Sequence, residues 1–567
     1  MASLSRKVEP MTTGPTDVSG TSGAATAAGG AIPGPRRRPR FALSRTDWLV
    51  LLAVAIVCGL AAFIGVPVLR EFGHDLFSVL GSSYRVNRGQ IPHRDFPSAF
   101  GPVFYLIVAG GLALSGLRPA GIGYANAVFG AVIGLWTYGI VRGRVAAAGA
   151  LLLAVYAALL IAAPFALGYN PLAFTYGMLY NRYGYGLLGV IVVECGLQAL
   201  RRPEAEGPGI GRGFSAGVAW ALLVFLKISY GVAAAPFLLL WVCCGTGRRR
   251  RVLALCGGFG ATAVIVLGYL RFDLADMFRD LTYAASGRAA SWRPAYMLRP
   301  VVVMESIPLL LLAVLLTAGT GEAAFPWRRL RVWWFVLAAI GVGGLLLTTN
   351  HQAMSLPLDG FAAVLLVDAV VRREARGSRS RWLPAMFLGT LCLLPLTAMS
   401  GVSLTAAAWE RYRGQEAPPV RVRSARGASL VFAPVLANLT TETGGPAYAE
   451  TLNDGMDLIR THAAPGEGVL AIDQFNPFNY LLDRPTPRGG MAIATYYMAF
   501  TETAHPSDDR YFGDARWALV RKYSRTAQDF PIEDFEIHGL VKTYQPGLEQ
   551  RFRLVEETGH WSLWRRK

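Results

Sequence analysis

A succession of apolar runs between residues 48 and 400 constrains the fold of this chain more than any other feature. A helix needs about 20 consecutive apolar residues to cross a hydrocarbon core about 30 Å thick. Of the 567 residues, 53% are hydrophobic and only 16% are charged, which a soluble protein of several domains rarely shows. The sequence therefore predicts a polytopic α-helical membrane protein.

The net charge of +18 does not indicate nucleic-acid binding, because most arginines form short clusters at the ends of apolar runs. Clusters in these positions orient a membrane protein. All six cysteines lie in apolar runs, without the spacing of a metal site or a disulfide framework. We expect membrane lipids as partners, no nucleic acid, no disulfides and no required cofactor.

Residues 1–45 are rich in Gly, Ala, Ser, Thr and Pro and contain no apolar segment of the kind found in signal peptides. They predict a disordered basic tail. An arginine cluster precedes the first apolar run, Trp48 to Leu69, and places the N-terminus in the cytoplasm.

The run from Val103 to Leu117 is the ambiguous one, since it is short for a span. If it crosses the membrane, all later arginine clusters fall outside, whereas an interfacial position places them inside. The second alternative gives eleven spans and an extracytoplasmic C-terminus. The expected spans are residues 48–69, 120–141, 145–167, 183–200, 213–226, 228–246, 252–270, 299–319, 331–348, 355–371 and 382–400.

Lys227 divides a continuous apolar stretch, residues 213–246, that is too long for one crossing. A lysine is costly in the middle of a span, so a helical hairpin with Lys227 at its outer turn is the expected structure. Residues 271–299 and residues 348–357 are expected as outer loops.

The composition changes after Ser400 to a water-soluble pattern. A helix is expected from Tyr448 to His462, followed by a buried strand, GVLAID. Residues 517–522 are expected to form a later strand. Residues 551–566 are expected to form a hairpin of two strands around Glu557 to Gly559. We expect a transmembrane catalytic domain over residues 46–400, with its first outer loop at 70–119, and an extracytoplasmic α/β domain over residues 401–567.

The stretch from Arg70 to Pro102 is polar, charged and rich in Gly and Pro, although it lies between two apolar runs. It contains two acids, Asp75 and Asp95, with His74 and Arg94 beside them. Such groups next to a bilayer indicate chemistry on a charged, membrane-borne substrate.

The order of these features resembles the GT-C superfamily of polyprenyl-phosphate-sugar-dependent glycosyltransferases. The resemblance rests on an early loop Asp, an element Gly89-x-x-Pro92-x-x-Asp95-Phe96, and a Gly-Pro pair that enters a half-apolar helix. That superfamily includes protein mannosyltransferases, aminoarabinose transferases and arabinosyltransferases. In layout the resemblance covers residues 45–400, and in motif the first loop alone.

The resemblance implies that Asp75 is the catalytic base, which would take the proton of the acceptor hydroxyl. The alternative is that Asp75 caps the helix that follows it. The superfamily pattern commonly has two adjacent acids, and this loop has one, so no metal site is predicted. Asp95 either supplies the second acid or pairs with Arg94 or Arg88.

The resemblance also implies that Lys227 contacts the donor phosphate, whereas a general interpretation makes it a lysine bound to lipid headgroups. Three arginines are either further phosphate ligands or membrane-edge anchors: Arg182, Arg271 and Arg299. His351 and Gln352 either bind sugar hydroxyls or cap helices.

Together these features predict an inverting glycosyltransferase in the bacterial plasma membrane. It would pass a sugar from a polyprenyl-phosphate donor to a glycan, lipid or protein acceptor. A transporter or flippase of lipid-linked sugars is the alternative from another class, and Glu194, Glu305 and Asp368 would be its coupling acids.

Overall fold

The computed structural model describes residues 43–70, 73–200, 210–244, 247–291, 295, 299–318, 326–350, 352, 355–374, 381–414, 420–433, 445–522 and 532–567. Arg45–Lys567 form one compact unit. The predicted tail, residues 1–45, lies almost entirely outside the described residues.

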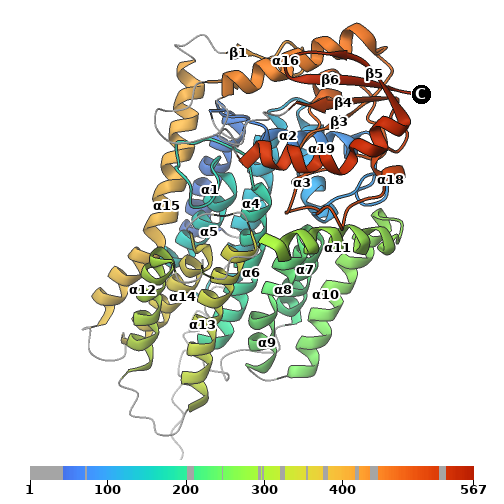
Figure 1. Cartoon of the computed structure of the whole chain (residues 1–567). Helices are drawn as coiled ribbons and strands as arrows, with labels where there is room; N and C mark the ends of the chain where they lie inside the picture. The colour runs from blue at the N-terminus through green and yellow to red at the C-terminus, as the bar shows by residue number, and fades with distance from the viewer. Residues whose placement is uncertain are drawn as a thin grey trace, which may run out of the picture. The chain divides into compact units, whose positions relative to one another are not determined.

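The unit begins with a long series of helices, which Figure 1 shows in blue through yellow. They are α1 (Arg45–Ile64), α2 (Asp75–Asn87), α3 (Pro102–Leu114), α4 (Gly121–Val141), α5 (Ala147–Ala162), α6 (Leu179–Leu200), α7 (Ile210–Leu226), α8 (Ile228–Ala233), α9 (Ala235–Cys243), α10 (Arg248–Tyr269), α11 (Leu274–Ser291), α12 (Pro300–Thr317), α13 (Pro326–Thr349), α14 (Pro357–Glu374) and α15 (Trp382–Arg413).

Within the described residues, six helices are long and apolar enough to cross a membrane, namely α1, α4, α6, α10, α13 and α15. Five further apolar stretches are shorter, such as α5, whose 16 residues extend about 24 Å. The chain is thus a polytopic α-helical membrane protein, as predicted. Each of the eleven predicted spans overlaps a helix, and residues 228–246 overlap two, α8 and α9. The number of crossings, eleven, stays a prediction.

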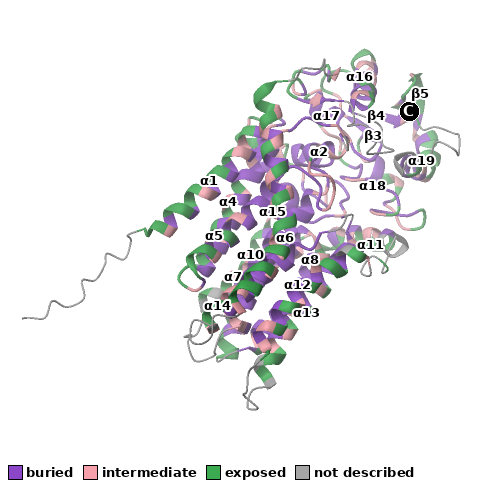
Figure 2. Cartoon of the chain, turned by 90° about the vertical axis from the view of Figure 1, so that its left-hand side faces the viewer, coloured by how far each residue is buried: buried purple, intermediate pink, exposed green. Residues whose placement is uncertain are grey.

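The exposed faces of the outer helices are apolar, as a lipid environment requires. In α1, for example, Trp48, Leu52 and Ile56 are all exposed, whereas α6 is buried along almost its whole length. Figure 2 shows this contrast between the exposed outer surface of α1 and the buried interior of the bundle. The side chains of α6 are therefore available for packing and polar contacts inside the protein.

The structure bears on two expectations about individual helices. The ambiguous run, Val103 to Leu117, contains the 13-residue helix α3, which is about 20 Å long, and its interfacial position stays a prediction. The helix of residues 213–246 breaks at Lys227, whose backbone is extended (φ −161°, ψ 120°). The indole of Trp220 in α7 then donates to the carbonyl of Gly231 in α8, so the chain folds back on itself after Lys227.

The C-terminal part contains β1 (Val420–Arg421), β2 (Val431–Phe432), α16 (Gly445–His462), β3 (Val469–Ile472), α17 (Phe478–Leu481), α18 (Asp508–Phe512), β4 (Trp517–Arg521), α19 (Ile532–Arg551), β5 (Phe552–Glu557) and β6 (Trp561–Arg566). Four strands form a sheet in the order β3-β4-β6-β5, in which β3 and β4 are parallel and the other pairs are antiparallel. This is an α/β arrangement, as predicted.

The sheet is covered on both faces, because alternate residues of its inner strands enter two different cores. Val469 and Ala471 of β3 belong to the main core, with α16, whereas Leu470 and Ile472 pack in a second core with α19. The predicted helix of α16, the strands β3 and β4, and the hairpin of β5 and β6 are all confirmed. Sequence reasoning missed α19, and residues 271–299, expected as a loop, contain the helix α11.

The polar first loop connects the two parts of the unit. Its helix α2 packs against α17, and Figure 1 shows α2 close to β3. A Cβ atom at Gly81 would lie 2.9 Å from the carbonyl oxygen of Asn476, so the approach of α2 leaves no room for a larger residue. The first loop is therefore held against the α/β part, between it and the apolar helices.

Candidate active site

A cavity of about 250 Å³ lies where the first loop, the segment before α6, the turn at Lys227 and the α/β part meet. Its walls are largely apolar and aromatic, with a small number of polar groups, which is the usual composition of a small-molecule site. The charged or titratable side chains that line it are His74, Asp75, Tyr169, Tyr180, Lys227 and Glu536.

Asp75 is the first residue of α2 and projects into the cavity wall at the helix N-terminus. The residue in the N-cap position is His74, not Asp75, and its imidazole Nε2 lies 3.7 Å from Oδ1 of Asp75. A Cβ atom at Gly177, in the segment before α6, would lie only 2.2 Å from Oδ2, so the carboxylate would have to move away from its position if a larger residue stood there. About a fifth of the Asp75 side chain is exposed.

Lys227 reaches the same cavity from the break between α7 and α8. Its ammonium donates a hydrogen bond to Oδ1 of Asn350 and lies 4.3 Å from the ring centre of Tyr180 and 5.3 Å from that of Phe100. Cation–π contacts of this kind stabilise a partly desolvated ammonium. These contacts thus hold the Lys227 side chain at the cavity wall.

Gly101 explains why the first loop lies so close to Lys227. Its N–H donates to the carbonyl of Leu226 at 3.0 Å, and a Cβ atom at this position would lie 1.9 Å from the carbonyl oxygen of Phe225. Only glycine permits that approach. The contact brings Phe100, the residue before Gly101, beside the ammonium.

The α/β part supplies a further wall of the cavity. Phe475, which follows β3, stacks on the imidazole of His74 with ring centres 5.8 Å apart and planes 15° apart. Its neighbour Gln474 donates to the carboxylate of Glu536 in α19 at 2.6 Å. A carboxylate, an amide and two flat rings therefore face the cavity from around these positions.

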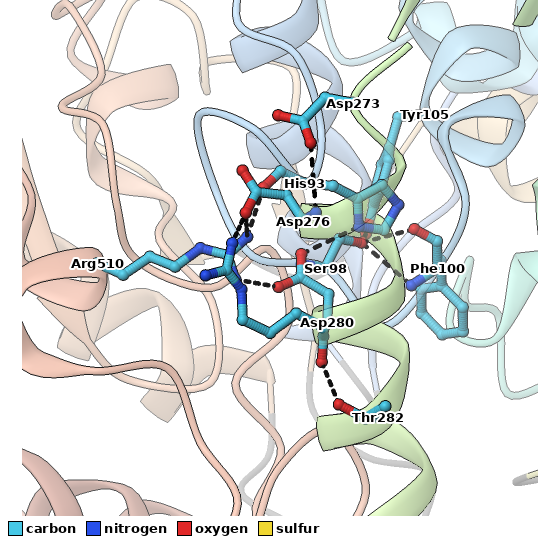
Figure 3. Close-up of polar contacts among 10 residues, drawn as sticks. His93, Ser98, Phe100, Tyr105, Asp273, Asp276, Asp280, Thr282 and Arg510 are labelled. Carbon is cyan, nitrogen blue, oxygen red and sulfur yellow. Dashed lines mark hydrogen bonds and ion pairs between the residues drawn. The ribbon is translucent and has the colours of Figure 1, made fainter. Parts of the chain in front are cut away.

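A buried ionic cluster lies behind this wall and joins three segments (Figure 3). Nδ1 of His93 lies 3.0 Å from Oδ2 of Asp280 in α11, and Nη1 of Arg510 in α18 lies 2.6 Å from Oδ1 of the same carboxylate. Arg510 also donates to the carbonyl of His93. Asp280 is almost completely buried, and a buried carboxyl group needs polar partners such as these to replace its lost hydration.

The cluster positions residues that line the cavity. The N–H of Ser98 donates to Asp280 at 2.9 Å, and the Ser98 hydroxyl donates to the carbonyl of Phe100. Ala99 and Phe100 form part of the cavity wall, and so does Ala284, one turn after Asp280 in α11. The ionic cluster thus fixes the first loop, α11 and the α/β part around one space.

Of the residues singled out in the sequence, three lie together at the cavity: His74, Asp75 and Lys227. Asp95 and Arg94 do not line it. Oδ2 of Asp95 accepts the N–H of Ile91 at 2.8 Å, and its Oδ1 lies 3.6 Å from Nε of Arg488 and 3.9 Å from Nε of Arg94. These contacts correspond to the pairing alternative for Asp95.

The predicted arginines are placed elsewhere. Arg182 is buried, and its guanidinium donates to the carbonyl of Leu160, in the last turn of α5, and to that of Phe165, which follows this helix. Arg271 is exposed at the end of α10, and Arg299 precedes the first residue of α12. None of the three lines the cavity.

Gln352 is buried and donates to the carbonyl of Ser355 at 2.8 Å, while His351 lies outside the described residues. Among the described residues, no group of three or more His, Cys, Asp or Glu side chains could hold a metal ion.

The alternation of aromatic and polar residues directly after the strand GVLAID marks Phe475 as suited to stacking on a sugar ring. Sequence reasoning missed the other cavity residues of the α/β part, Gln474 and Glu536, and the anchoring residues Asp280 and Arg510. Nothing in the sequence relates residue 74 to residue 475 before the chain is folded.

The fold and this cavity define a polytopic membrane protein with a mixed polar and aromatic site between its helices and an α/β part. No family model matches the sequence, and no curated protein matches it. Solved structures similar to the chain include ArnT from Cupriavidus metallidurans bound to undecaprenyl phosphate. It has a TM-score of 0.44 and 13% identity, over 92% of this chain and 98% of that one.

Another is the archaeal oligosaccharyltransferase AglB from Archaeoglobus fulgidus, in complex with an inhibitory peptide and a dolichol-phosphate. Its TM-score is 0.38 with 10% identity, over 92% of this chain and 74% of that one. Both TM-scores lie below 0.5, so neither likeness by itself establishes a common fold.

Proposed function

We propose that the protein is an integral-membrane glycosyltransferase that moves a sugar from a polyprenyl-phosphate carrier to an acceptor hydroxyl. One observation carries this proposal: a carboxylate, Asp75, and an ammonium, Lys227, line the same cavity although 152 positions separate them in the sequence. Glycosyl transfer from a phosphate needs a proton acceptor for the incoming hydroxyl and a positive charge for the leaving phosphate.

Asp75 is the base in this proposal. As the acceptor oxygen forms its bond to the anomeric carbon, its proton passes to the Asp75 carboxylate. The bond from the anomeric carbon to the phosphate oxygen breaks with its electron pair on the phosphate. One base and no evident nucleophile correspond to a single displacement, which inverts the configuration of the anomeric carbon.

Lys227 stabilises the phosphate as negative charge grows on it. Its ammonium has three N–H donors, one of which reaches the neutral amide of Asn350. An entering phosphate therefore gains a charge-assisted hydrogen bond.

The carboxylate and amide of Glu536 and Gln474, with Phe475 between them and His74, are suited to binding a hydroxyl-rich sugar ring. Asp95 acts in the proposal as a structural residue, since its carboxylate is used within the first loop. We place the enzyme in the bacterial plasma membrane with residues 401–567 extracytoplasmic, and the boundaries at residues 45 and 400 are part of that proposal.

The experiment is to reconstitute the full chain in liposomes with a polyprenyl-phosphate sugar labelled in the sugar and to supply envelope fractions as acceptors. We expect the label to leave the lipid and to appear on an acceptor, with release of polyprenyl phosphate. Movement of intact labelled lipid between the leaflets, without cleavage, would instead identify a flippase and overturn the proposal.

A further inference from the structure

A second cavity, of about 750 Å³, lies between the turn from α3 to α4 and the α/β part. We call it the arginine pocket, because its lining includes four arginines, Arg118, Arg426, Arg460 and Arg484, with one acid, Asp483. The remaining lining residues are small or apolar, apart from two serines. No residue lines both this pocket and the cavity of the candidate active site.

The single acid does not neutralise the pocket. Its Oδ1 accepts hydrogen bonds from Tyr84 at 3.0 Å and from Arg88 at 2.5 Å, and it lies 2.7 Å from Nη2 of Arg426. Burial alone would raise the pKa of Asp483. The Tyr84 hydrogen bond and the charges of Arg426 and Arg88 outweigh it and hold this pKa below its usual value.

Two of the arginines already bind other groups of the protein, so they act on an anion in the pocket only through the electrostatic field of their charges. Arg484 is buried and donates to the carbonyls of Ala463 and Glu467, between α16 and β3. Arg460 pairs with Asp457 at 3.1 Å. Their charges persist at the pocket wall, where low-dielectric surroundings strengthen attraction for an anion.

Arg118 and Arg426 retain hydrogen-bonding capacity. Arg118 is exposed in the turn before α4, and its side chain has no partner among the described residues. Arg426 lies over the rings of Tyr84 and Tyr480, and its Nη1 is buried with no hydrogen-bond partner in the described part of the chain. A buried unpaired donor is unfavourable, and an anionic oxygen that the side chain turns toward would satisfy it.

The position of the pocket indicates where such an anion comes from. Pro119 lies in its wall, and α4, one of the helices long enough to cross a membrane, begins two residues later. The hydroxyl of Tyr480 donates to the carbonyl of Leu117, which fixes the α/β part on this same turn. A pocket at the end of a span lies at the level of lipid headgroups.

We propose that the arginine pocket binds the phosphate group of an anionic lipid headgroup. Arg118 and Arg426 contact the phosphate oxygens, for which the planar guanidinium is the best-matched side chain. Arg460 and Arg484 add long-range attraction. The proposal is independent of glycosyl transfer, because it concerns a separate cavity and a ligand that is not consumed.

The test measures ligand binding to the purified full chain in a neutral detergent by calorimetry. The probes are dihexanoyl phosphatidylglycerol, the zwitterionic dihexanoyl phosphatidylcholine, and glycerol phosphate, which carries the phosphate without acyl chains. We expect the parent protein to bind the phosphatidylglycerol at least tenfold more tightly than the phosphatidylcholine. Arg118→Gln should weaken that binding about tenfold, and Arg118→Gln with Arg426→Gln about a hundredfold.

Arg553→Gln is the matched control, because it removes one exposed positive charge from β5, away from the pocket. If Arg426→Gln lowers the melting temperature, the exposed Arg118 alone still decides the test. Equal binding of both lipids, or equal binding by the Arg118 and Arg553 variants, would overturn the proposal. If glycerol phosphate binds as tightly as phosphatidylglycerol, the pocket recognises a phosphate group, and the proposal that this phosphate belongs to a lipid is wrong.

Discussion

The stretch from Arg70 to Pro102 has two halves, residues 70–84 and residues 85–102, and both carry charged side chains, which they use in opposite ways. In the first half, His74 and Asp75 line the cavity of the candidate active site. In the second half, the guanidinium of Arg85 donates to the carbonyls of Pro487, Gly489 and Gly490, and the carbonyl of Asp95 accepts the N–H of Gly489. These polar groups of the first half thus face a cavity, and those of the second half hold the α/β part in place.

The cations Lys227 and Arg182 show the same division. Both were candidates for binding phosphate. Arg182 donates its hydrogen bonds to backbone carbonyls in and after the last turn of α5, whereas Lys227 lies at the cavity wall. The difference teaches that a charged residue near a membrane is a site candidate only when the backbone around it has not already used its hydrogen bonds.

The largest expected difference is between the two acids of the loop. Asp75→Asn should lower the rate of sugar transfer by about 10²- to 10⁴-fold, the usual contribution of a general base. Donor binding and the unfolding temperature should stay close to those of the parent, because the amide keeps the shape of the side chain. Turnover of a labelled donor and calorimetric binding measure the two effects.

Asp95→Asn is the matched control, and it should leave transfer nearly intact while lowering the unfolding temperature. If the Asp75 variant still transfers sugar and a well-folded Asp95 variant does not, then Asp95 is the base and Asp75 is not.

The next effect concerns the structural half of the loop. Arg85 is buried, and burial lowers its pKa to about 9, so it remains charged at neutral pH. Arg85→Gln removes charge-assisted hydrogen bonds to three carbonyls and should destabilise the folded protein by about 3 kcal/mol. Thermal unfolding of the detergent-solubilised protein measures this loss.

Arg88→Gln gives the comparison, since Arg88 directly follows α2, three residues after Arg85, and almost half of its side chain is exposed. It should cost less than about 1 kcal/mol. Equal losses in the two variants would mean that the carbonyl contacts of Arg85 do not hold the α/β part.

The third effect is on donor binding at the cavity. Lys227→Gln should weaken binding of a polyprenyl-phosphate sugar by about ten- to hundredfold, because one charge-assisted hydrogen bond is lost. Lys227→Arg should restore only part of the affinity. The arginine keeps the positive charge, but its planar guanidinium needs different positions of the phosphate oxygens. Binding of the neutral polyprenol should be unchanged, and a Gln variant that binds the charged donor as tightly as the parent would make Lys227 an interface anchor only.

Patterns along the chain predicted whole elements well. The break at Lys227 was predictable because one lysine divides an apolar stretch too long for one span. The strand β3 was predictable because VLAI is apolar at every position, which is typical of a strand buried on both faces. In both places a local property of the sequence, length or periodicity, decides the structure.

The cavity was only half predictable, since its walls come from distant segments. Asp75 and Lys227 were found because charge beside apolar sequence is conspicuous, but Gln474 and Glu536 have ordinary surroundings in the sequence. Arg182 shows the opposite difficulty: only the fold brings the carbonyls of Leu160 and Phe165 to its guanidinium. Tertiary contacts, which local sequence patterns do not reveal, decide which charged residues line the cavity and which ones stabilise the fold.

The smallest expected effect lies in the α/β part, far from either half of the loop. The hydrogen bond from the indole of Trp517 to Glu467, with further ones from the N–H of Ala464 and from Arg516, holds the pKa of Glu467 below its usual value. Because the folded state favours the ionised form, this group stabilises the fold at neutral pH, above its ordinary pKa.

That stabilisation should disappear as the pH falls through the lowered pKa of the folded state. Glu467→Gln should therefore lower the unfolding temperature at pH 7 by an amount equivalent to less than about 1 kcal/mol, since the site is near the surface. At a pH well below the ordinary pKa of a glutamate, the two proteins should unfold at nearly the same temperature. If the difference in unfolding temperature between the two proteins is instead the same at every pH in that range, Glu467 stabilises the fold through packing and its charge does not, unlike the charge of the buried Arg85.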